Sequence, residues 1–229
     1  MTRQAIRDLL TSQAEDYLKT IYQLARGGKV TTQSLADALG VTPASVSGML
    51  RKLSDLSLVE HTPYYGAILT ENGQKVALEI LRHHRLLELY LTQALGFSWD
   101  EVHEEADRLE HVISEAFEAK ISALLGDPHF DPHGHPIPRL DGSMPDHDVE
   151  SLTDALVDEQ VTISRVHDGD PEFLRYLSEL GLIPGVELLV LKKDSLGGTL
   201  SIQVSGHQHV LSLGVAQKIW VLPRHASKS

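Results

Sequence analysis

Four potential metal ligands lie close together near the middle of the chain, at positions i, i+4, i+7 and i+8: His103, Asp107, Glu110 and His111. On a helix that turns by about 100° per residue, these positions share one arc of about 100°. Imidazole and carboxylate groups gathered on one face suit manganese, iron, cobalt, nickel or zinc. The spacing therefore indicates a metal site, although an acidic helix can also carry such side chains as an ordinary solvated face.

Two other segments offer ligands of the same kind. His84 and Glu88 are four residues apart, which places them on one face of a helix, and Asp16 lies near the N-terminus. Ligands from three segments are harder to attribute to chance than any single pair. The chain has no cysteine, so thiolate zinc sites, iron–sulfur clusters and disulfides are excluded, and the remaining donors favour harder ions such as Mn²⁺.

Three helices are predicted to carry these ligands. Apolar residues at helical spacing predict one over residues 12–25, with Ser12 and Glu15 as a capping box. The same reasoning predicts long helices over residues 71–95 and 98–125. An apolar stripe along the last of them is typical of a core or a homodimer seam: Val102, Ala106, Leu109, Ile113, Ala116, Phe117 and Ile121.

Between the first and second of these helices, the sequence predicts a winged helix-turn-helix. A short helix over residues 32–39 ends at Gly40, and another begins at Thr42-Pro43 and runs to about residue 56. Two strands follow, over residues 58–60 and 67–70. Helix-turn-helix geometry also occurs inside enzymes and helical bundles, but the added wing favours a DNA-binding domain.

Residues 127–151 contain five of the ten prolines and are predicted to form a linker. Four histidines in this segment are interpreted as loop and surface residues: His129, His133, His135 and His147. Beyond it, one helix over residues 171–180 and five strand-like segments predict a small β-barrel-like module. The strand-like segments are residues 161–163, 186–191, 200–204, 209–211 and 219–221.

Taken alone, the formal net charge of −12 argues against binding to phosphate backbones. Residues 1–76, however, carry eight Lys and Arg against seven Asp and Glu, a balance of +1, whereas the rest carries 12 against 25, a balance of −13. The acidity thus belongs to the predicted metal-binding and C-terminal parts. The sequence lacks a signal-peptide pattern and an apolar run of roughly 18 residues, so we expect a cytoplasmic protein without a membrane partner.

These segments together resemble the diphtheria toxin repressor family of metal-dependent transcriptional regulators, including its manganese-responsive branch. The resemblance rests on AEDYLKTIYQL, SLADALGVTPASVSGMLRKL, HRLLELYL, VHEEADRLEHVISEAF, HPIP and FLRYLSELGLIPG. It implies an α+β multidomain fold. The implied parts are a winged helix-turn-helix DNA-binding domain (1–72), a helical dimerisation and metal-binding domain (73–126), the linker (127–151) and an SH3-like domain (152–229).

Carried over residue by residue, the resemblance implies two metal sites. The regulatory site is expected to consist of Asp16, Asp107, Glu110 and His111. The ancillary site is expected to consist of His84, Glu88 and His103, completed by a carboxylate of the SH3-like domain, either Asp170 or Glu172. Acids at 16 and 107 favour Mn²⁺, or permit both Mn²⁺ and Fe²⁺, with other divalent transition metals binding in vitro. Lys19 departs from the two-manganese relatives, which have glutamate there, and argues against a closely spaced metal pair.

The resemblance further implies a repressor, not an enzyme, that binds palindromic operator DNA as a homodimer when it is loaded with metal. Small residues at the start of the recognition helix are expected to lie close to base edges and phosphates: Thr42, Ala44, Ser45, Ser47 and Gly48. Candidate contacts to the DNA backbone are Arg51, Lys52, Lys29, Tyr64 and Tyr65. Because few of these side chains are long and polar, shape readout is expected to contribute.

Two other functions are compatible with parts of the pattern. A winged-helix regulator could respond to a small organic ligand, with the acids and histidines merely solvating a helix. A metallohydrolase could use His103, Asp107 and His111, but the sequence offers neither a nucleophile motif nor residues that suggest a substrate pocket. The SH3-like domain could bind proline-rich peptides, although its few aromatic residues suggest no groove.

Overall fold

The computed structural model describes residues 10–25, 28–62, 65–145 and 148–222. The chain forms two compact units. The first comprises Met1–His84, Leu109–Glu115 and Pro138–Ser143, and the second comprises Arg85–Arg108, Ala116–Ile137 and Met144–Ser229. Within the described residues, no helix is both long and apolar enough to cross a membrane.

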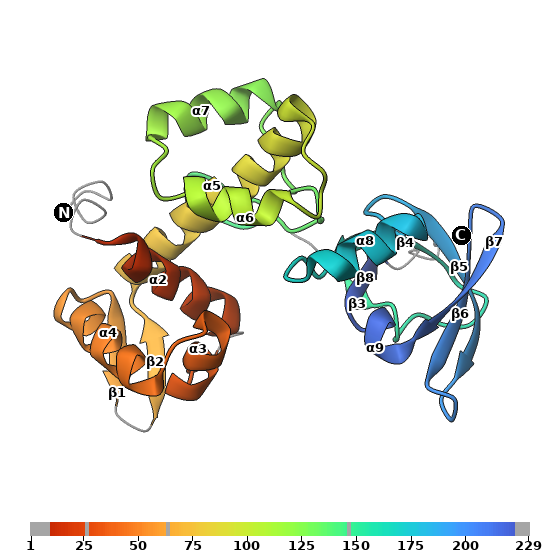
Figure 1. Ribbon diagram of the computed structural model, residues 1–229, viewed down its shortest axis with the longest axis horizontal. Coiled ribbons are helices and arrows are strands. Elements are labelled where there is room, and N and C mark those ends of the chain that lie inside the picture. The colour runs from red at the N-terminus through yellow and green to blue at the C-terminus, as the bar shows by residue number, and fades with distance from the viewer. Residues whose placement is uncertain (1–9, 26–27, 63–64, 146–147, 223–229) are drawn as a thin grey trace, which may run out of the picture. The chain divides into compact units, whose positions relative to one another are not determined.

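The first unit contains the winged helix-turn-helix (Figure 1). Its elements are α2 (Ser12–Ala25), α3 (Thr32–Leu39), α4 (Pro43–Asp55), β1 (Val59–Thr62) and β2 (Gly66–Leu69). The two strands pair antiparallel, with Val59 opposite Leu69 and Thr62 opposite Gly66. The predictions of three helices and a wing are therefore confirmed.

Local sequence explains the turn between α3 and α4. Gly40 adopts a left-handed conformation with φ of 64°, which ends α3 at little cost because glycine has no Cβ. Thr42 accepts a hydrogen bond from the backbone N–H of Ser45, and Pro43 begins α4. The predicted cap of α2 is wrong, since the hydroxyl of Thr11, not Ser12, accepts from Ala14 N at 3.3 Å.

Three further helices carry the predicted ligands: α5 (Glu71–Leu95), α6 (Val102–Leu109) and α7 (Glu115–Leu124). The prediction of one helix over residues 98–125 is wrong, because residues 110–114 interrupt it. At this break the carbonyl of Glu110 accepts a hydrogen bond from the Nδ1 of buried His83 at 3.1 Å. A side chain thus takes the place of a regular helical partner, and the β-branched Val112 and Ile113 that follow do not favour helix.

The second unit contains a six-stranded antiparallel sheet with the order β3-β8-β4-β5-β6-β7. The strands are β3 (Glu150–Ser151), β4 (Gln160–Val166), β5 (Glu187–Asp194), β6 (Thr199–Val204), β7 (His207–Ser212) and β8 (Ile219–Leu222), accompanied by α8 (Pro171–Glu179) and α9 (Leu213–Ala216). Register shifts in β4 and β5 mark irregularities of the kind that bend a sheet. All five predicted strand segments and the helix are present.

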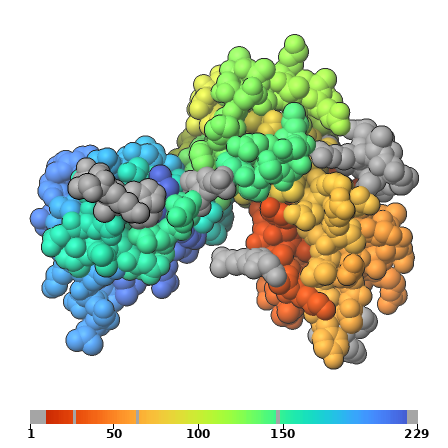
Figure 2. All heavy atoms as spheres, turned by 180° about the vertical axis from the view of Figure 1, so that it is seen from behind, coloured from red at the N-terminus to blue at the C-terminus, as the bar shows by residue number. Residues whose placement is uncertain are grey.

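The proline-rich segment before this sheet is packed. Gly134 approaches β4 so closely that a Cβ at this position would lie 1.9 Å from the carbonyl oxygen of Ser164. The backbone N–H of Val166 donates to the carbonyl of His133 at 3.0 Å. Further along, Arg82 donates to the carbonyl of Pro138 at 2.8 Å, and the blue-green residues of this segment lie against the yellow-orange start of α5 in Figure 2.

The interpretation of its histidines is corrected in part. His133 is fully buried and His135 is largely covered, because the segment folds back on the helices and on β4. His129 is exposed as expected, and His147 lies outside the described residues.

Candidate metal centres

The first cluster of ligands, in the first unit, joins α2 to the turn that follows α6. Nε2 of His111 lies 3.0 Å from Asp16 Oδ1 and 3.4 Å from Glu110 Oε1. Nδ1 of the same ring lies 2.6 Å from Oε2 of Glu15. One ligand atom each from Asp16, Glu110 and His111 falls within 4.8 Å of the others, which is compatible with a shared ion.

Glu110 is the most enclosed group of this cluster, with no exposed surface. Its Oε1 accepts a hydrogen bond from Lys19 Nζ at 2.6 Å, and its Oε2 lies 2.6 Å from Nδ1 of His84. A buried carboxylate must be paired and hydrogen-bonded to remain charged, and here an ammonium and an imidazole provide the partners.

Burial alone would lower the pKa of His111, but its hydrogen bonds to Asp16 and Glu15 and the charges of Glu110 and Asp16 outweigh burial and raise the pKa to about 9. The ring is therefore protonated at neutral pH, and a metal ion must displace that proton to bind. Carboxylates and an imidazole, neutralised by a proton and an ammonium, form a donor set that fits a divalent cation such as Mn²⁺.

Asp107, the fourth residue predicted for the regulatory site, lies in the second unit. Its Oδ2 is 3.8 Å from Nε2 of His103, and its side chain is 46% exposed. The single-face argument for all four ligands depended on one continuous helix. Since α6 ends at Leu109, Glu110 and His111 are presented by a turn and not by that helix.

The second cluster, in the second unit, is built around Glu88 on α5. Ligand atoms of Glu88, Asp131 and His133 lie within 4.8 Å of one another, and all three residues are buried. Nδ1 of His133 is 3.8 Å from Glu88 Oε2, and Nδ1 of His103 is 3.1 Å from Glu88 Oε1. The other ring nitrogen of His133 donates to the carbonyl of Trp99 at 2.7 Å, which fixes the orientation of the ring.

The second cluster also fits a metal ion. Within the described parts of the chain, Asp131 Oδ2, His133 Nδ1 and His135 Nδ1 are buried and make no hydrogen bond. Such atoms are costly unless an ion or another partner satisfies them. Burial would lower the pKa of His133, but the nearby carboxylates of Glu88, 3.8 Å away, and Asp131 outweigh burial and raise the pKa to about 9.

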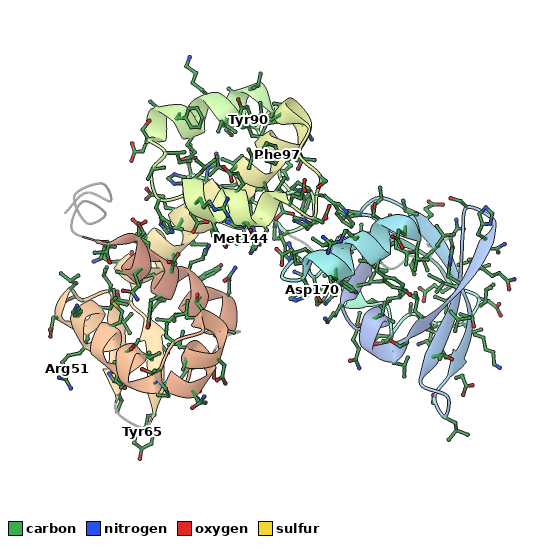
Figure 3. The ribbon with its side chains drawn as sticks, in the orientation of Figure 1. Arg51, Tyr65, Tyr90, Phe97, Met144 and Asp170 are labelled. Atoms are coloured by element: carbon green, nitrogen blue, oxygen red, sulfur yellow. The ribbon has the colours of Figure 1, made fainter. Side chains whose placement is uncertain are left out.

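The C-terminal module contributes one carboxylate to this neighbourhood, Asp168. Its Oδ2 lies 3.4 Å from Nδ1 of His135. Burial would raise the pKa of Asp168, but the charge of His135, aided by those of His133 and His103, holds it below the usual range. The sequence analysis named Asp170 or Glu172 instead. Asp170 caps α8, accepting from the backbone N–H groups of Glu172 at 3.0 Å and Phe173 at 3.3 Å (Figure 3).

Of the residues predicted for the ancillary site, Glu88 and His103 lie in the second unit, where Nδ1 of His103 is 3.1 Å from Oε1 of Glu88. His84 lies in the first unit, where its Nδ1 is 2.6 Å from Oε2 of Glu110. Sequence reasoning missed Asp131, His133 and Asp168. The sequence did contain a signal for these residues, since potential ligands alternate at Asp131, His133 and His135. Alternate residues of an extended chain point the same way, so these side chains could reach one site.

The candidate DNA-binding surface lies on the first unit. Thr42, Ala44, Ser45 and Gly48 are exposed at the start of α4, and Ser47 is half-buried. Arg51, Lys52 and Lys29 are exposed, as is Tyr65 with 72% of its surface accessible. Figure 3 shows Arg51 and Tyr65 pointing away from the body of this domain. Tyr64 lies outside the described residues.

Models of known families match three consecutive parts of the chain. Residues 9–67 match the N-terminal DNA-binding domain of iron-dependent repressors, and residues 70–139 match their metal-binding and dimerisation domain. Residues 150–223 match the FeoA domain. The matched families thus follow the order expected from the fold class: a DNA-binding domain, a metal-binding and dimerisation domain, and a C-terminal domain.

Relatives and solved structures agree with these matches. The iron-dependent repressor IdeR of Mycobacterium tuberculosis is 31% identical over 216 residues, covering 88% of this chain and 92% of the relative. The diphtheria toxin repressor of Corynebacterium glutamicum is 30% identical, covering 81% and 86%.

Among solved structures, a manganese-dependent transcriptional repressor in complex with manganese superposes with a TM-score of 0.85 at 39% identity, covering 92% of this chain and 99% of the other. ScaR with bound Cd²⁺ superposes with a TM-score of 0.78 at 34% identity, covering 92% and 99%. The chain therefore belongs to the family of metal-dependent transcriptional repressors that includes IdeR and the diphtheria toxin repressor.

Proposed function

We propose that this chain is a manganese-responsive repressor, also able to use Fe²⁺, which binds palindromic operator DNA as a homodimer when metal occupies the cluster around His111. The observation that carries the proposal is the contact of Asp16, on a helix of the DNA-binding domain, with His111. Asp107 is retained in the proposed regulatory set with Asp16, Glu110 and His111.

The regulatory cluster couples ligand binding to the DNA-binding domain through α2. Tyr17, Leu18 and Ile21 of this helix are buried in the core of the winged domain. A divalent ion would attract the carboxylates of α2 and those of the turn after α6 at the same time. Asp16 and Glu110 would then hold α2, and the winged domain with it, in one position. Without that attraction, the carboxylates repel one another and depend on Lys19 and the proton of His111.

A homodimer is supported by apolar side chains left exposed around α7. Leu95 is 56% exposed, Val112 74%, Phe117 45% and Leu124 69%. Phe97 is 38% exposed, and its backbone N–H donates to the carbonyl of Leu91 at 3.1 Å. The ring of Tyr90 packs edge-on against that of Phe117, with 6.5 Å between the ring centroids. Burial of such side chains against a second copy would be favourable, and a twofold dimer would present two recognition helices to a palindromic site.

We propose a second ion site at Glu88, Asp131 and His133, with Asp168 and His103 close by. This assignment modifies the ancillary site expected from the sequence, because the carboxylate from the C-terminal module is now Asp168 and not Asp170 or Glu172. Its support is the set of buried ligand atoms without hydrogen bonds described above. An ion there would hold the segment from Asp131 to Ile137 against the C-terminal module and stabilise the second unit.

The test is operator binding as a function of metal. A duplex selected from a random pool with Mn²⁺ present is titrated with the full chain at fixed ionic strength, because affinity for DNA depends steeply on salt. Mn²⁺, Fe²⁺ under anaerobic conditions, Co²⁺ and Zn²⁺ are compared. We expect Mn²⁺ to raise the affinity at least about a hundredfold, a coupling of about 2.7 kcal/mol.

Two variants locate the effect. His111→Ala and Asp107→Ala should each remove the response to Mn²⁺ while the chain remains a folded dimer. Glu104→Ala is the matched control on α6, since this side chain is 74% exposed and pairs only weakly with Arg108 at 3.5 Å. An unchanged response in both ligand variants would refute the site, and Mn²⁺-independent binding by the parent chain would refute the proposed function.

A further inference from the structure

The regulatory cluster contains a positive charge of its own. Nζ of Lys19 lies 2.6 Å from Oε1 of Glu110, although the two residues are 91 positions apart in sequence. Only 11% of the lysine side chain is exposed, and the glutamate side chain is fully enclosed. An ammonium held this far from water forms a substantial interaction, in contrast to a surface ion pair, whose charges are screened.

The ammonium engages the same oxygen that faces the other ligands. Oε1 of Glu110 is 3.4 Å from Nε2 of His111, and that nitrogen is 3.0 Å from Oδ1 of Asp16. The second oxygen of Glu110 is taken by Nδ1 of His84. A cation bound by Glu110, His111 and Asp16 must therefore share Oε1 with Lys19 or displace it. In either case, two positive charges compete for one buried carboxylate.

We propose that Lys19 is a built-in competing cation, which lowers the affinity of the regulatory cluster for divalent metal and so sets the metal concentration at which the repressor responds. The proposal rests on the proposed function, in that Asp16, Glu110 and His111 are taken to hold the ion. In this scheme Lys19 is not a ligand, and it sets the affinity of the cluster through its contact with Glu110.

Competition predicts effects of opposite sign in the two states of the protein. In the metal-free chain, Lys19 satisfies a buried carboxylate, so its removal should destabilise the fold. In the metal-bound chain, Lys19 opposes the ion, so its removal should strengthen metal binding. A lysine that merely supports the structure would weaken both states together.

The test replaces Lys19 with methionine, which keeps the length of the side chain and removes its charge. Isothermal titration of the full chain with Mn²⁺ gives the affinity, and the binding phase that His111→Ala abolishes identifies the regulatory cluster. We expect Lys19→Met to tighten that phase at least about tenfold. We also expect the melting temperature of the metal-free chain to fall, and the increase produced by saturating Mn²⁺ to grow.

Lys75→Met is the matched control, because Lys75 pairs with Glu71 on the surface of α5, with side chains 42% and 84% exposed. It should leave both measurements unchanged. Lys19→Arg keeps the charge and should not tighten Mn²⁺ binding. Lys19→Gln provides a second uncharged variant that can still donate a hydrogen bond to Glu110, and it should tighten binding like the methionine.

Each outcome of these measurements either supports or overturns the proposed role of Lys19. Equal or weaker Mn²⁺ binding by folded Lys19→Met and Lys19→Gln would overturn the proposal. Variants that fold only with Mn²⁺ would support it, and variants that stay unfolded at saturating Mn²⁺ would show that Lys19 is a scaffold and overturn it. The proposed function is judged separately, on the parent chain, and it fails if that chain lacks a Mn²⁺-binding phase that depends on His111 or binds its operator equally well without Mn²⁺.

Discussion

The two ligand clusters balance their charges in different ways. The cluster around His111 contains an ammonium from Lys19 and further carboxylates from α2, and Asp16 remains 40% exposed. The cluster around Glu88 is enclosed, and buried atoms of Asp131 and His133 in it make no hydrogen bond among the described residues. If both clusters hold ions as proposed, the first arrangement can exist with or without its ion, whereas the second should depend more on an ion for its stability.

The largest expected difference concerns DNA binding. Glu110→Gln should abolish the Mn²⁺-stimulated rise in operator affinity, a loss of at least about a hundredfold, because the buried carboxylate that links α2 to the turn after α6 is neutralised. Glu88→Gln should reduce operator affinity only severalfold and should chiefly diminish the stabilisation of the fold by Mn²⁺. Mobility shifts and melting curves on the same samples measure both. Equal losses of DNA binding in the two variants would erase the distinction between the clusters.

The pH dependence provides a second test, since the pKa values of His111 and His133 are both raised to about 9. A raised folded-state pKa means that each protonated ring contributes stability fully below about pH 6.5, its unfolded value, and that this contribution is lost as pH rises through 9. The metal-free chain should therefore lose stability between pH 6.5 and 9.

Metal binding should show the opposite trend, with affinity rising by up to about tenfold per pH unit over this range, as one proton leaves for each ion bound. Melting curves in chelator and Mn²⁺ titrations at several pH values measure the two trends. His111→Ala should abolish the regulatory phase and leave the pH dependence of the other phase intact, and a pH-independent affinity in the parent chain would contradict the shared role of the two histidines.

A substitution that touches no ligand can distort the second cluster alone. Gly134→Ala would place a Cβ 1.9 Å from the carbonyl oxygen of Ser164, at a φ of +86° that disfavours other residues. The loop carrying Asp131 and His133 would have to move, with a cost of at least about 2 kcal/mol. Chemical denaturation should show this loss of stability. Gly126→Ala is the control, because Gly126 also has a positive φ, +75°, but a Cβ added there meets no atom within 4 Å. The control therefore measures the backbone strain without the steric clash.

The smallest expected effect comes from a residue next to a ligand. His83→Leu removes the hydrogen bond to the carbonyl of Glu110, leaving that group unsatisfied at a cost of about 1–3 kcal/mol. The turn that presents Glu110 and His111 should loosen, so Mn²⁺ affinity should fall severalfold at the regulatory cluster and stay constant at the other. His61→Leu, on β1, is a control distant in sequence from both clusters, and a fall at both sites after His83→Leu would indicate general destabilisation.

Much of the fold could be predicted because local signals specify it. Thr42, Pro43 and Gly40 mark helix ends through their own backbone preferences, and alternating apolar residues mark the strands. The break after Leu109 was not predicted, because Val112 and Ile113 are only a weak local signal for it and the contacts of Glu110 with His83 and Lys19 join residues that are distant in sequence. Periodicity describes a helix only while such tertiary contacts do not override it.

The same limit applies to the sites. Asp16, Glu110 and His111 were found through residue type, spacing and resemblance, and the structure gathers these three. Asp168 was missed because Asp170, two residues on, has the same chemistry, and only the helix cap at Asp170 distinguishes them. The composition of residues 127–151 correctly indicated an irregular backbone but carried no information on its burial.

The loop around Asp131 has a consequence for the speed of metal exchange. Oδ1 of Asp131 accepts hydrogen bonds from the backbone N–H groups of His133 at 2.8 Å and His135 at 2.9 Å, while Oδ2 makes none. One oxygen thus shapes the loop, and the other makes no hydrogen bond and lies 3.6 Å from Nε of Arg85. Because the loop is ordered by the protein's own bonds, an arriving ion need not organise it. If an ion binds there as proposed, its association should be governed by access to buried ligand atoms and its residence by the rate of escape. This ion should then outlast fluctuations in metal supply to which the other cluster responds.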